Sequence, residues 1–220
     1  FSGTSTLNIS GQNVVLFNIN STSSTIDFSG VSVGTEAPGS SYILGNLTNG
    51  KVIYNSAANL KSNGVLLNGI NTNVVLGSSA NITAAPGETG IAGVVLSGWY
   101  TGASPYTPGI DGQNNGTIAL GDSSVGLYGS NGARLENTNI VTIGNSGLGL
   151  SSSDAGSLIK NSGVITVGSN SQGIFLKDGL TIDNTGIIQS TGVSSLGIYA
   201  DNITSPIHNT STGVIDLSGD

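Results

Sequence analysis

The fold is decided by the stretch Asn161-Ser162-Gly163-Val164-Ile165-Thr166-Val167-Gly168, which is followed five residues later by Gly173-Ile174-Phe175. Its centre is a short run of β-branched residues in which apolar and polar side chains alternate. Ile165 and Val167 can point to one face while Thr166 points to the other, as in a half-buried strand. Glycine interrupts every apolar run, which disfavours a long helix. The stretch therefore predicts one short strand, a turn, and the start of a second strand.

The same pattern recurs along the second half of the chain. Copies begin at Asn114, Asn137, Asn161, Asn184 and Asn209, and these residues lie 23, 24, 23 and 25 positions apart. The glycines that close the copies, Gly126, Gly149, Gly173 and Gly197, lie 23, 24 and 24 apart. A third apolar pair, such as Leu158-Ile159, lies between copies, so each period supplies three short strands. Short strands at this period predict an all-β parallel β-helix, a solenoid of 23–24 residues per coil and roughly nine coils.

Stacked coils bring the repeated Asn residues into register. Asn137, Asn161 and Asn184 can then hydrogen-bond through their side-chain amides up the stack, which satisfies polar groups at a corner. The glycine two positions later is expected to supply a positive φ at that corner. A ligand site built from these Asn residues is the alternative, and we prefer the structural interpretation.

The first half follows the same pattern less regularly. Residues 1–113 are expected to form irregular solenoid coils with loop insertions, residues 114–220 to form regular repeats, and both to belong to one continuous domain. The expected insertions are Gly34–Ser41, Ala84–Gly90 and Ser97–Gln113. The chain opens at Phe1 without a charged and apolar leader, so we expect a segment of a longer protein.

Composition excludes several classes of function. There is no Cys and only one His, which removes disulfide scaffolds, thiolate sites and multi-His zinc sites. Five Lys and Arg against 12 Asp and Glu give a net charge of −7, so we expect no nucleic-acid partner. No apolar run is long enough to span a bilayer, so we expect no membrane insertion of this segment. No cofactor and no metal are expected.

Motifs for catalysis are weak. Residues 45–51 have the spacing of a phosphate-binding loop, but Val52 stands where Ser or Thr would hold Mg²⁺ and a strand pattern follows. Gly121-Asp122-Ser123 occupies a slot that other copies fill with turn residues. The acids are dispersed, with no close pair of carboxylates for glycoside chemistry. We therefore predict that the chain is not an enzyme, and keep a carbohydrate-active β-helix enzyme as the third alternative.

The insertion 97–113 holds the only Trp and two of the six Tyr. Insertions on solenoids project from one face, and aromatic residues on projecting loops supply binding area at low entropic cost. Candidate ligand-binding residues are therefore Trp99, Tyr100, Tyr106 and Asp111. The alternative is that Trp99 and Tyr106 pack the loop onto its own coil.

A second aromatic set lies in the repeats. Tyr128, Phe175 and Tyr199 share one slot of successive copies and predict a stacked aromatic column that is partly core. A platform for a ligand is the less favoured interpretation.

The copies quoted above resemble the passenger repeats of bacterial type V autotransporters, in particular the very large adhesin passengers of the fusobacterial type. The resemblance covers residues 105–220 in motif and the first half only in composition. It implies a right-handed parallel β-helix, displayed outside the cell as part of an outer-membrane-anchored passenger. It also implies partners such as a host cell-surface protein receptor, a host glycan or another bacterial surface.

Three functions follow from these observations. The first is a surface-displayed adhesin segment that mediates cell attachment. The second is a structural stalk or spacer of a passenger, favoured by the seamless repeats of the second half. The third is the enzyme named above. Ice binding by a flat Thr array is a weak fourth, because the outward positions Ala119, Thr142, Thr166 and Gln189 are mixed.

Overall fold

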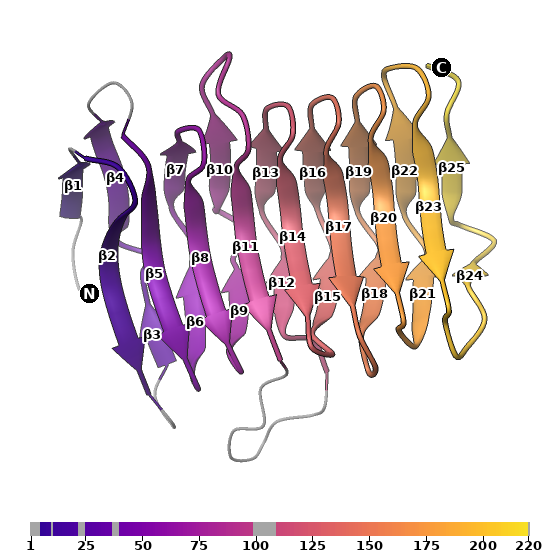
Figure 1. Cartoon of the computed structure of the whole chain (residues 1–220), viewed down its shortest axis with the longest axis horizontal. Coiled ribbons are helices and arrows are strands. Elements are labelled where there is room, and N and C mark those ends of the chain that lie inside the picture. Colours follow the sequence, from indigo (N-terminus) through magenta and orange to yellow (C-terminus); the bar gives the residue numbers. More distant parts are fainter. Residues whose placement is uncertain (1–4, 10, 22–24, 37–39, 99–108, 220) are drawn as a thin grey trace.

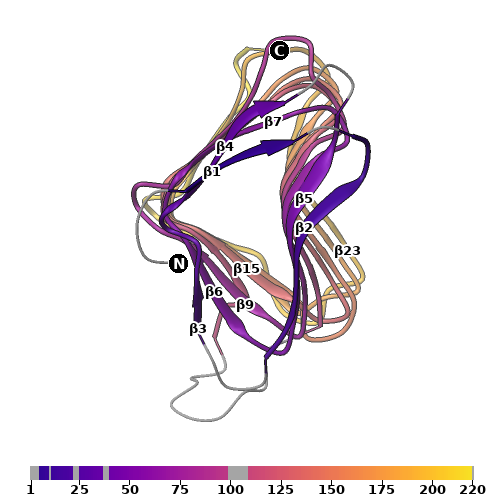
Figure 2. The same ribbon diagram turned by 90° about the vertical axis from the view of Figure 1, so that its left-hand side faces the viewer.

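The computed structural model of the chain describes residues 5–9, 11–21, 25–36, 40–98 and 109–219. These residues form strands and turns and contain no α-helix, so none of them could cross a membrane as a helix. Three parallel sheets run along the molecule (Figure 1). They enclose a three-sided interior (Figure 2). The chain is a right-handed parallel β-helix, as the repeat predicted.

Sheet I has eight strands: β2 (Val14–Asn20), β5 (Tyr42–Thr48), β8 (Val65–Ile70), β11 (Ala92–Ser97), β14 (Val125–Ser130), β17 (Leu148–Ser153), β20 (Gln172–Lys177) and β23 (Leu196–Asp201). Sheet II also has eight: β3 (Thr25–Asp27), β6 (Lys51–Tyr54), β9 (Asn73–Leu76), β12 (Gly112–Asn114), β15 (Arg134–Asn137), β18 (Leu158–Asn161), β21 (Thr181–Asn184) and β24 (His208–Asn209).

Sheet III has seven strands: β7 (Ala57–Leu60), β10 (Asn81–Ala84), β13 (Thr117–Leu120), β16 (Ile140–Ile143), β19 (Val164–Val167), β22 (Ile187–Ser190) and β25 (Val214–Asp216). A separate parallel pair, β1 (Ser5–Ile9) and β4 (Val31–Glu36), lies at the N-terminal end. Each coil passes through sheets I, II and III in that order before it returns to sheet I one strand further along the axis.

The solenoid has about eight coils, judged by the eight strands of sheets I and II, rather than the roughly nine that the average period suggested. The difference comes from insertions. Val65 pairs with Ala92, 27 positions later, and Ala92 pairs with Val125, 33 positions later, whereas Val125 pairs with Leu148 after 23. The long coils contain the expected insertions after β10 and after β11.

The interior is a continuous stack of aliphatic side chains. Val141, Ile165 and Ile188 pair in register on successive strands of sheet III and are each 0% exposed. Thr166 is half-buried on the outer side of the same sheet. The alternation predicted for Val164–Val167 is therefore confirmed. Burial of such aliphatic side chains stabilises the fold by about 1.5–3 kcal/mol each.

The corner between sheets II and III carries the Asn ladder. Asn Nδ2 donates to the next Asn Oδ1 from Asn114 to Asn137 (2.8 Å), Asn137 to Asn161 (2.9 Å), Asn161 to Asn184 (2.8 Å) and Asn184 to Asn209 (2.7 Å). Asn114, Asn137, Asn161 and Asn184 are at most 1% exposed. The ladder is therefore a buried structural element, as predicted, and it links five successive coils.

The same corner is apolar in the first half. Tyr54 pairs with Leu76, and Leu76 pairs with Asn114. Both Tyr54 and Leu76 are 0% exposed. Tyr54 donates its hydroxyl proton to the Ala57 carbonyl oxygen at 2.9 Å, and its burial raises the pKa of the phenol. In the irregular first half, large side chains therefore fill this corner. In the regular second half, hydrogen-bonded Asn side chains fill it.

We predicted that the glycines at the Asn corner supply a positive φ, and this prediction is wrong. Gly163 and Gly186, which follow the ladder residues, do not have a positive φ. A Cβ at Gly163 would lie 2.0 Å from the Asn139 carbonyl oxygen, and one at Gly186 would lie 2.1 Å from the Gly163 oxygen. The constraint is close approach of stacked backbones.

The left-handed conformations lie at the other two corners. One residue after each sheet I strand has a positive φ in seven successive coils: Asn49, Asn71, Gly98, Asn131, Asp154, Asp178 and Asn202. At the corner between sheets III and I the non-glycine residues with a positive φ include Asn63, Ser123, Ser146, Asn170 and Ser194. Asn and Asp tolerate this region better than other non-glycine residues because their side chains bond locally.

Candidate functional site

The insertion between β11 and β12 departs from the corner between sheets I and II, and its base is firmly held. The Val74 amide donates to the Asp111 carbonyl oxygen at 2.7 Å, and the Asp111 amide donates to the Arg134 carbonyl oxygen at 2.8 Å. Asn73 Nδ2 donates to the Ile110 carbonyl oxygen at 2.7 Å. The chain therefore re-enters sheet II in register immediately after the insertion.

Asp111, one of the predicted site residues, is 0% exposed. Its Oδ2 accepts a hydrogen bond from the Arg134 backbone amide at 2.9 Å. This carboxylate therefore bonds to the next coil at the base of the insertion. The other predicted residues, Trp99, Tyr100 and Tyr106, lie outside the described residues.

The aromatic column predicted for the repeats lies on the outer side of sheet I. Tyr128 pairs with Ser151, Ser151 with Phe175, and Phe175 with Tyr199. Tyr128 and Tyr199 are 37% and 40% exposed, and Phe175 is half-buried. The Phe175 and Tyr199 rings stack with centroids 5.1 Å apart and planes 3° apart. The predicted stacking is confirmed for Phe175 and Tyr199, whereas Ser151 separates Tyr128 from them, and the rings lie outside the core.

Tyr128 points outward because the two residues before it, Gly126 and Leu127, both face the interior. A Cβ at Gly126 would lie 2.8 Å from Val141 Cγ1, inside the core, and Leu127 is itself 0% exposed. The alternation is thereby displaced by one position, and Tyr128 faces outward. The glycines of this slot form a column, because a Cβ at Gly149 would lie 2.4 Å from the Gly173 carbonyl oxygen.

A second apolar row runs beside the rings. Val125 pairs with Leu148, and the row continues through Gln172 to Leu196, which is 46% exposed. The two rows together form what we call the aromatic face: Val95, Val125, Tyr128, Leu148, Phe175, Leu196 and Tyr199. Ser130, Ser153, Lys177 and Asp201 line one of its edges. Sequence reasoning missed Val125, Leu148 and Leu196, although they occupy one slot of the repeat.

Ser151 lies between two rings of the column and is only 3% exposed. The aromatic face thus consists of apolar side chains on successive strands of sheet I, with Ser151 in the ring column and Gln172 in the second row. Contiguous apolar surface with a polar edge is typical of an interaction site.

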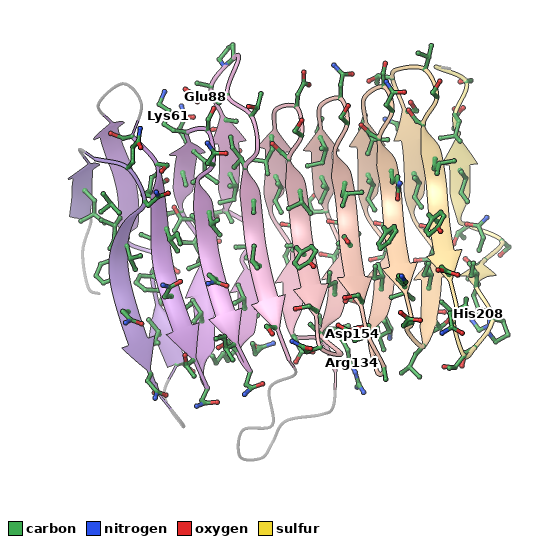
Figure 3. The ribbon with its side chains drawn as sticks, in the orientation of Figure 1. Lys61, Glu88, Arg134, Asp154 and His208 are labelled. Atoms are coloured by element: carbon green, nitrogen blue, oxygen red, sulfur yellow. The ribbon has the colours of Figure 1, made fainter. Side chains whose placement is uncertain are left out.

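Three charged residues on sheet II alternate in sign along the axis, because Glu136 pairs with Lys160 and Lys160 with Asp183. Asp183 pairs in turn with His208. The Asp183 Oδ1 and His208 Nδ1 atoms are 3.0 Å apart, and Figure 3 shows His208 at the C-terminal end. Gln113 Nε2 donates to Glu136 Oε2 at 2.7 Å. This face has no single-sign charge field with which to attract a highly charged partner.

The remaining motifs are structural. Gly45 to Thr48 lie within β5 and Lys51 begins β6, so the stretch that has phosphate-loop spacing is a corner between two strands. Ser123 has φ 54° and stands in the turn column with Ser146 and Asn170. Within the described ranges, no three His, Cys, Asp or Glu residues gather where they could hold a metal ion.

Known proteins give no further guide to the site. No family model, no curated protein and no solved structure matches the chain.

Proposed function

We propose that this chain is a binding segment of a surface-displayed β-helical adhesin, and that the aromatic face is its contact surface. The observation that carries the proposal is the exposure of Tyr128, Tyr199 and Leu196 on the outer side of one sheet, where they are 37%, 40% and 46% exposed. Aromatic side chains in such a patch contribute large contact area at low entropic cost. The partner is a host cell-surface receptor, a glycan or another bacterial surface.

The resemblance to autotransporter passengers supports the same proposal. In that setting the solenoid is displayed outside the cell, and its lateral faces are the surfaces that a partner can reach. The candidate residues of the insertion, Trp99, Tyr100 and Tyr106, are a second proposed contact region, and the described strands that flank it, β11 and β12, belong to sheets I and II.

A stalk is the second candidate, and one observation favours it. The Asn ladder links five coils without interruption, which suits a rigid spacer. In that case the aromatic face contacts nothing on the target cell.

The test measures binding of the purified chain to fixed human epithelial cells and to a mammalian glycan array. The variant Tyr128→Ser/Phe175→Ser/Tyr199→Ser removes the rings. The matched control, Ile140→Ser/Val214→Ser, removes apolar side chains that are 40% and 46% exposed on sheet III. Circular dichroism establishes that all three proteins are folded.

We expect the ring variant to lose at least tenfold in affinity and the control to bind as the intact chain does. If both variants bind equally well while a chain trimmed at 99–108 does not, the contact surface is the insertion. If the intact chain binds nothing, the stalk is the better interpretation.

A further inference from the structure

A shallow groove of about 400 Å³ runs along the corner between sheets II and III, away from the aromatic face. Its volume is within the range of about 300–1,000 Å³ that is usual for small-ligand sites. Its lining residues come from four successive coils, so it follows the solenoid axis beside the Asn ladder. The proposed function does not use it.

The floor of the groove is backbone, because Gly163 and Gly186 cannot carry side chains. A Cβ at either position would lie about 2 Å from a carbonyl oxygen of the preceding coil. Asn139 occupies the equivalent position one coil earlier, and its Nδ2 donates to the Asn115 carbonyl oxygen at 3.1 Å. The Asn139 side chain closes one end of the groove, and Thr212 stands at the other.

One wall is a row of hydroxyl groups. Thr138 Oγ1 donates to the Asn114 carbonyl oxygen (3.1 Å), Ser162 Oγ to the Asn137 oxygen (3.5 Å) and Thr185 Oγ1 to the Asn161 oxygen (3.3 Å). Because a hydroxyl has one proton and two lone pairs, each oxygen can still accept a hydrogen bond. All three residues are exposed, and they follow one another at the coil spacing of about 4.8 Å.

The opposite wall is apolar. It consists of Val164, which is half-buried, and Ile187, which is 36% exposed. The two side chains lie on neighbouring strands of sheet III in register. A ligand in the groove therefore meets acceptor oxygens on one side and methyl groups on the other.

The floor offers no amide to an anion or to a peptide strand. The Gly163 and Gly186 amides donate to the Asn137 and Asn161 carbonyl oxygens at 3.2 and 3.1 Å, and the Ile187 amide donates to the Gly163 oxygen at 2.8 Å. No Lys, Arg, Asp or Glu is among the described residues that line the groove. The ligand must therefore be uncharged and must bring its own hydrogen-bond donors together with an apolar face.

We propose that this groove binds a neutral oligosaccharide that lies along the solenoid axis. Its hydroxyl groups donate to Thr138, Ser162 and Thr185, and the C–H face of its rings rests on Val164 and Ile187. The site is separate from the aromatic face, so the test of this proposal is independent of the test of the function proposed above.

The experiment uses the whole chain, labelled with ¹⁵N, and three probes: maltotetraose, cellotetraose and lacto-N-neotetraose. We expect at least one probe to shift the amide resonances of Gly163, Val164 and Gly186, and the sialylated form of lacto-N-neotetraose to bind more weakly than the neutral form. The variant Ser162→Ala/Thr185→Val removes two acceptors without changing the shape of the groove. Loss of two hydrogen bonds weakens binding about 25-fold, measured by calorimetry.

The control is Thr117→Val/Thr142→Val, which changes two sheet III threonines that do not line the groove. We expect it to bind within about twofold of the intact chain. The proposal is overturned if no neutral probe shifts the groove amides at about 10 mM, or if the control weakens binding as much as the groove variant does. Should the groove variant fail to fold, the amide shifts of the intact chain decide the question alone.

Discussion

Asn137 Nδ2 lies 2.9 Å from Asn161 Oδ1, and the two residues are 0% and 1% exposed. Both side chains are buried, so their amide groups depend on protein partners: Asn137 Nδ2 donates to the Asn139 carbonyl oxygen of its own coil at 3.0 Å as well as to Asn161 of the next coil. An unpartnered buried amide costs about 1–3 kcal/mol. The ladder therefore fixes the register of the coils as well as their stability.

The position of a ladder residue should determine how much its loss costs. Asn161→Leu breaks bonds to both Asn137 and Asn184, whereas Asn114→Leu breaks one ladder bond and places Leu beside Leu76, its partner in register. We expect losses in the free energy of unfolding of about 3 kcal/mol and about 1 kcal/mol respectively. Urea denaturation of the two variants measures the difference, and equal losses would contradict the ladder as a stabilising element.

The glycine column of sheet I should not accept even one methyl group. A Cβ at Gly149 would lie 2.4 Å from the Gly173 carbonyl oxygen and 2.6 Å from Ile165 Cγ2. We expect Gly149→Ala to cost at least about 3 kcal/mol, since backbone and core would both have to move. Gly45→Ala is the control, because its Cβ would meet only side-chain atoms, the nearest being Leu67 Cδ2 at 3.2 Å and Leu47 Cδ1 at 3.5 Å, and thermal unfolding should place it within a few degrees of the intact chain.

Acid should weaken the fold through Glu88. Its Oε2 accepts hydrogen bonds from the Ser62 hydroxyl and amide at 2.6 and 2.7 Å. These bonds, with Lys61 Nζ at 3.4 Å, hold the pKa of the carboxyl below its ordinary value of 4.5. Lys61 and Glu88 stand together at the edge of the solenoid (Figure 3).

Because the folded pKa is the lower one, the stabilisation is present above pH 4.5 and is lost as the pH falls through the folded pKa. Glu88→Gln should therefore show a smaller loss of unfolding free energy than the intact chain on acidification below that pH, measured in urea. Above that pH, the unfolding free energies of the variant and the intact chain should change with pH in parallel. Asp27 and Asp216 have pKa values lowered in the same way by Ser29 and Ser218, so some slope persists in the variant.

The stacked rings on sheet I should be coupled energetically. The Phe175 and Tyr199 centroids are 5.1 Å apart, and such pairs contribute about 0.5–1.5 kcal/mol beyond their burial. A double-mutant cycle of Phe175→Ala and Tyr199→Ala in urea denaturation should return that coupling. The cycle of Tyr128→Ala and Tyr199→Ala, whose members are separated by two strands, should return a value near zero.

Trimming the insertion should leave the solenoid intact if its base is kept. We expect replacement of residues 99–108 by Gly-Asn to leave the thermal midpoint within a few degrees of the intact chain. Replacement of the whole range 97–113 should lower it clearly, because Asp111 and most of β12 are then lost together with their bonds to Val74 and Arg134. Equal midpoints for the two trimmed chains would show that the base does not hold the coil.

The sequence alone determined the period, the three strands of each coil, the inward positions of a sheet III strand and the Asn ladder. These features are local or repeat at one spacing, so they can be read as a pattern: Ile165 and Val167 alternate with Thr166, and Asn137, Asn161 and Asn184 recur. Only the tertiary structure showed that Gly163 is required because the backbone of the preceding coil approaches it closely. It also showed that Gly126 and Leu127 both face the interior, so that Tyr128 faces outward. The groove at the Asn corner also belongs to the tertiary structure. Each of these depends on how closely one coil lies on the next, and that separation follows from packing between residues more than 20 positions apart, which no single copy of the repeat contains.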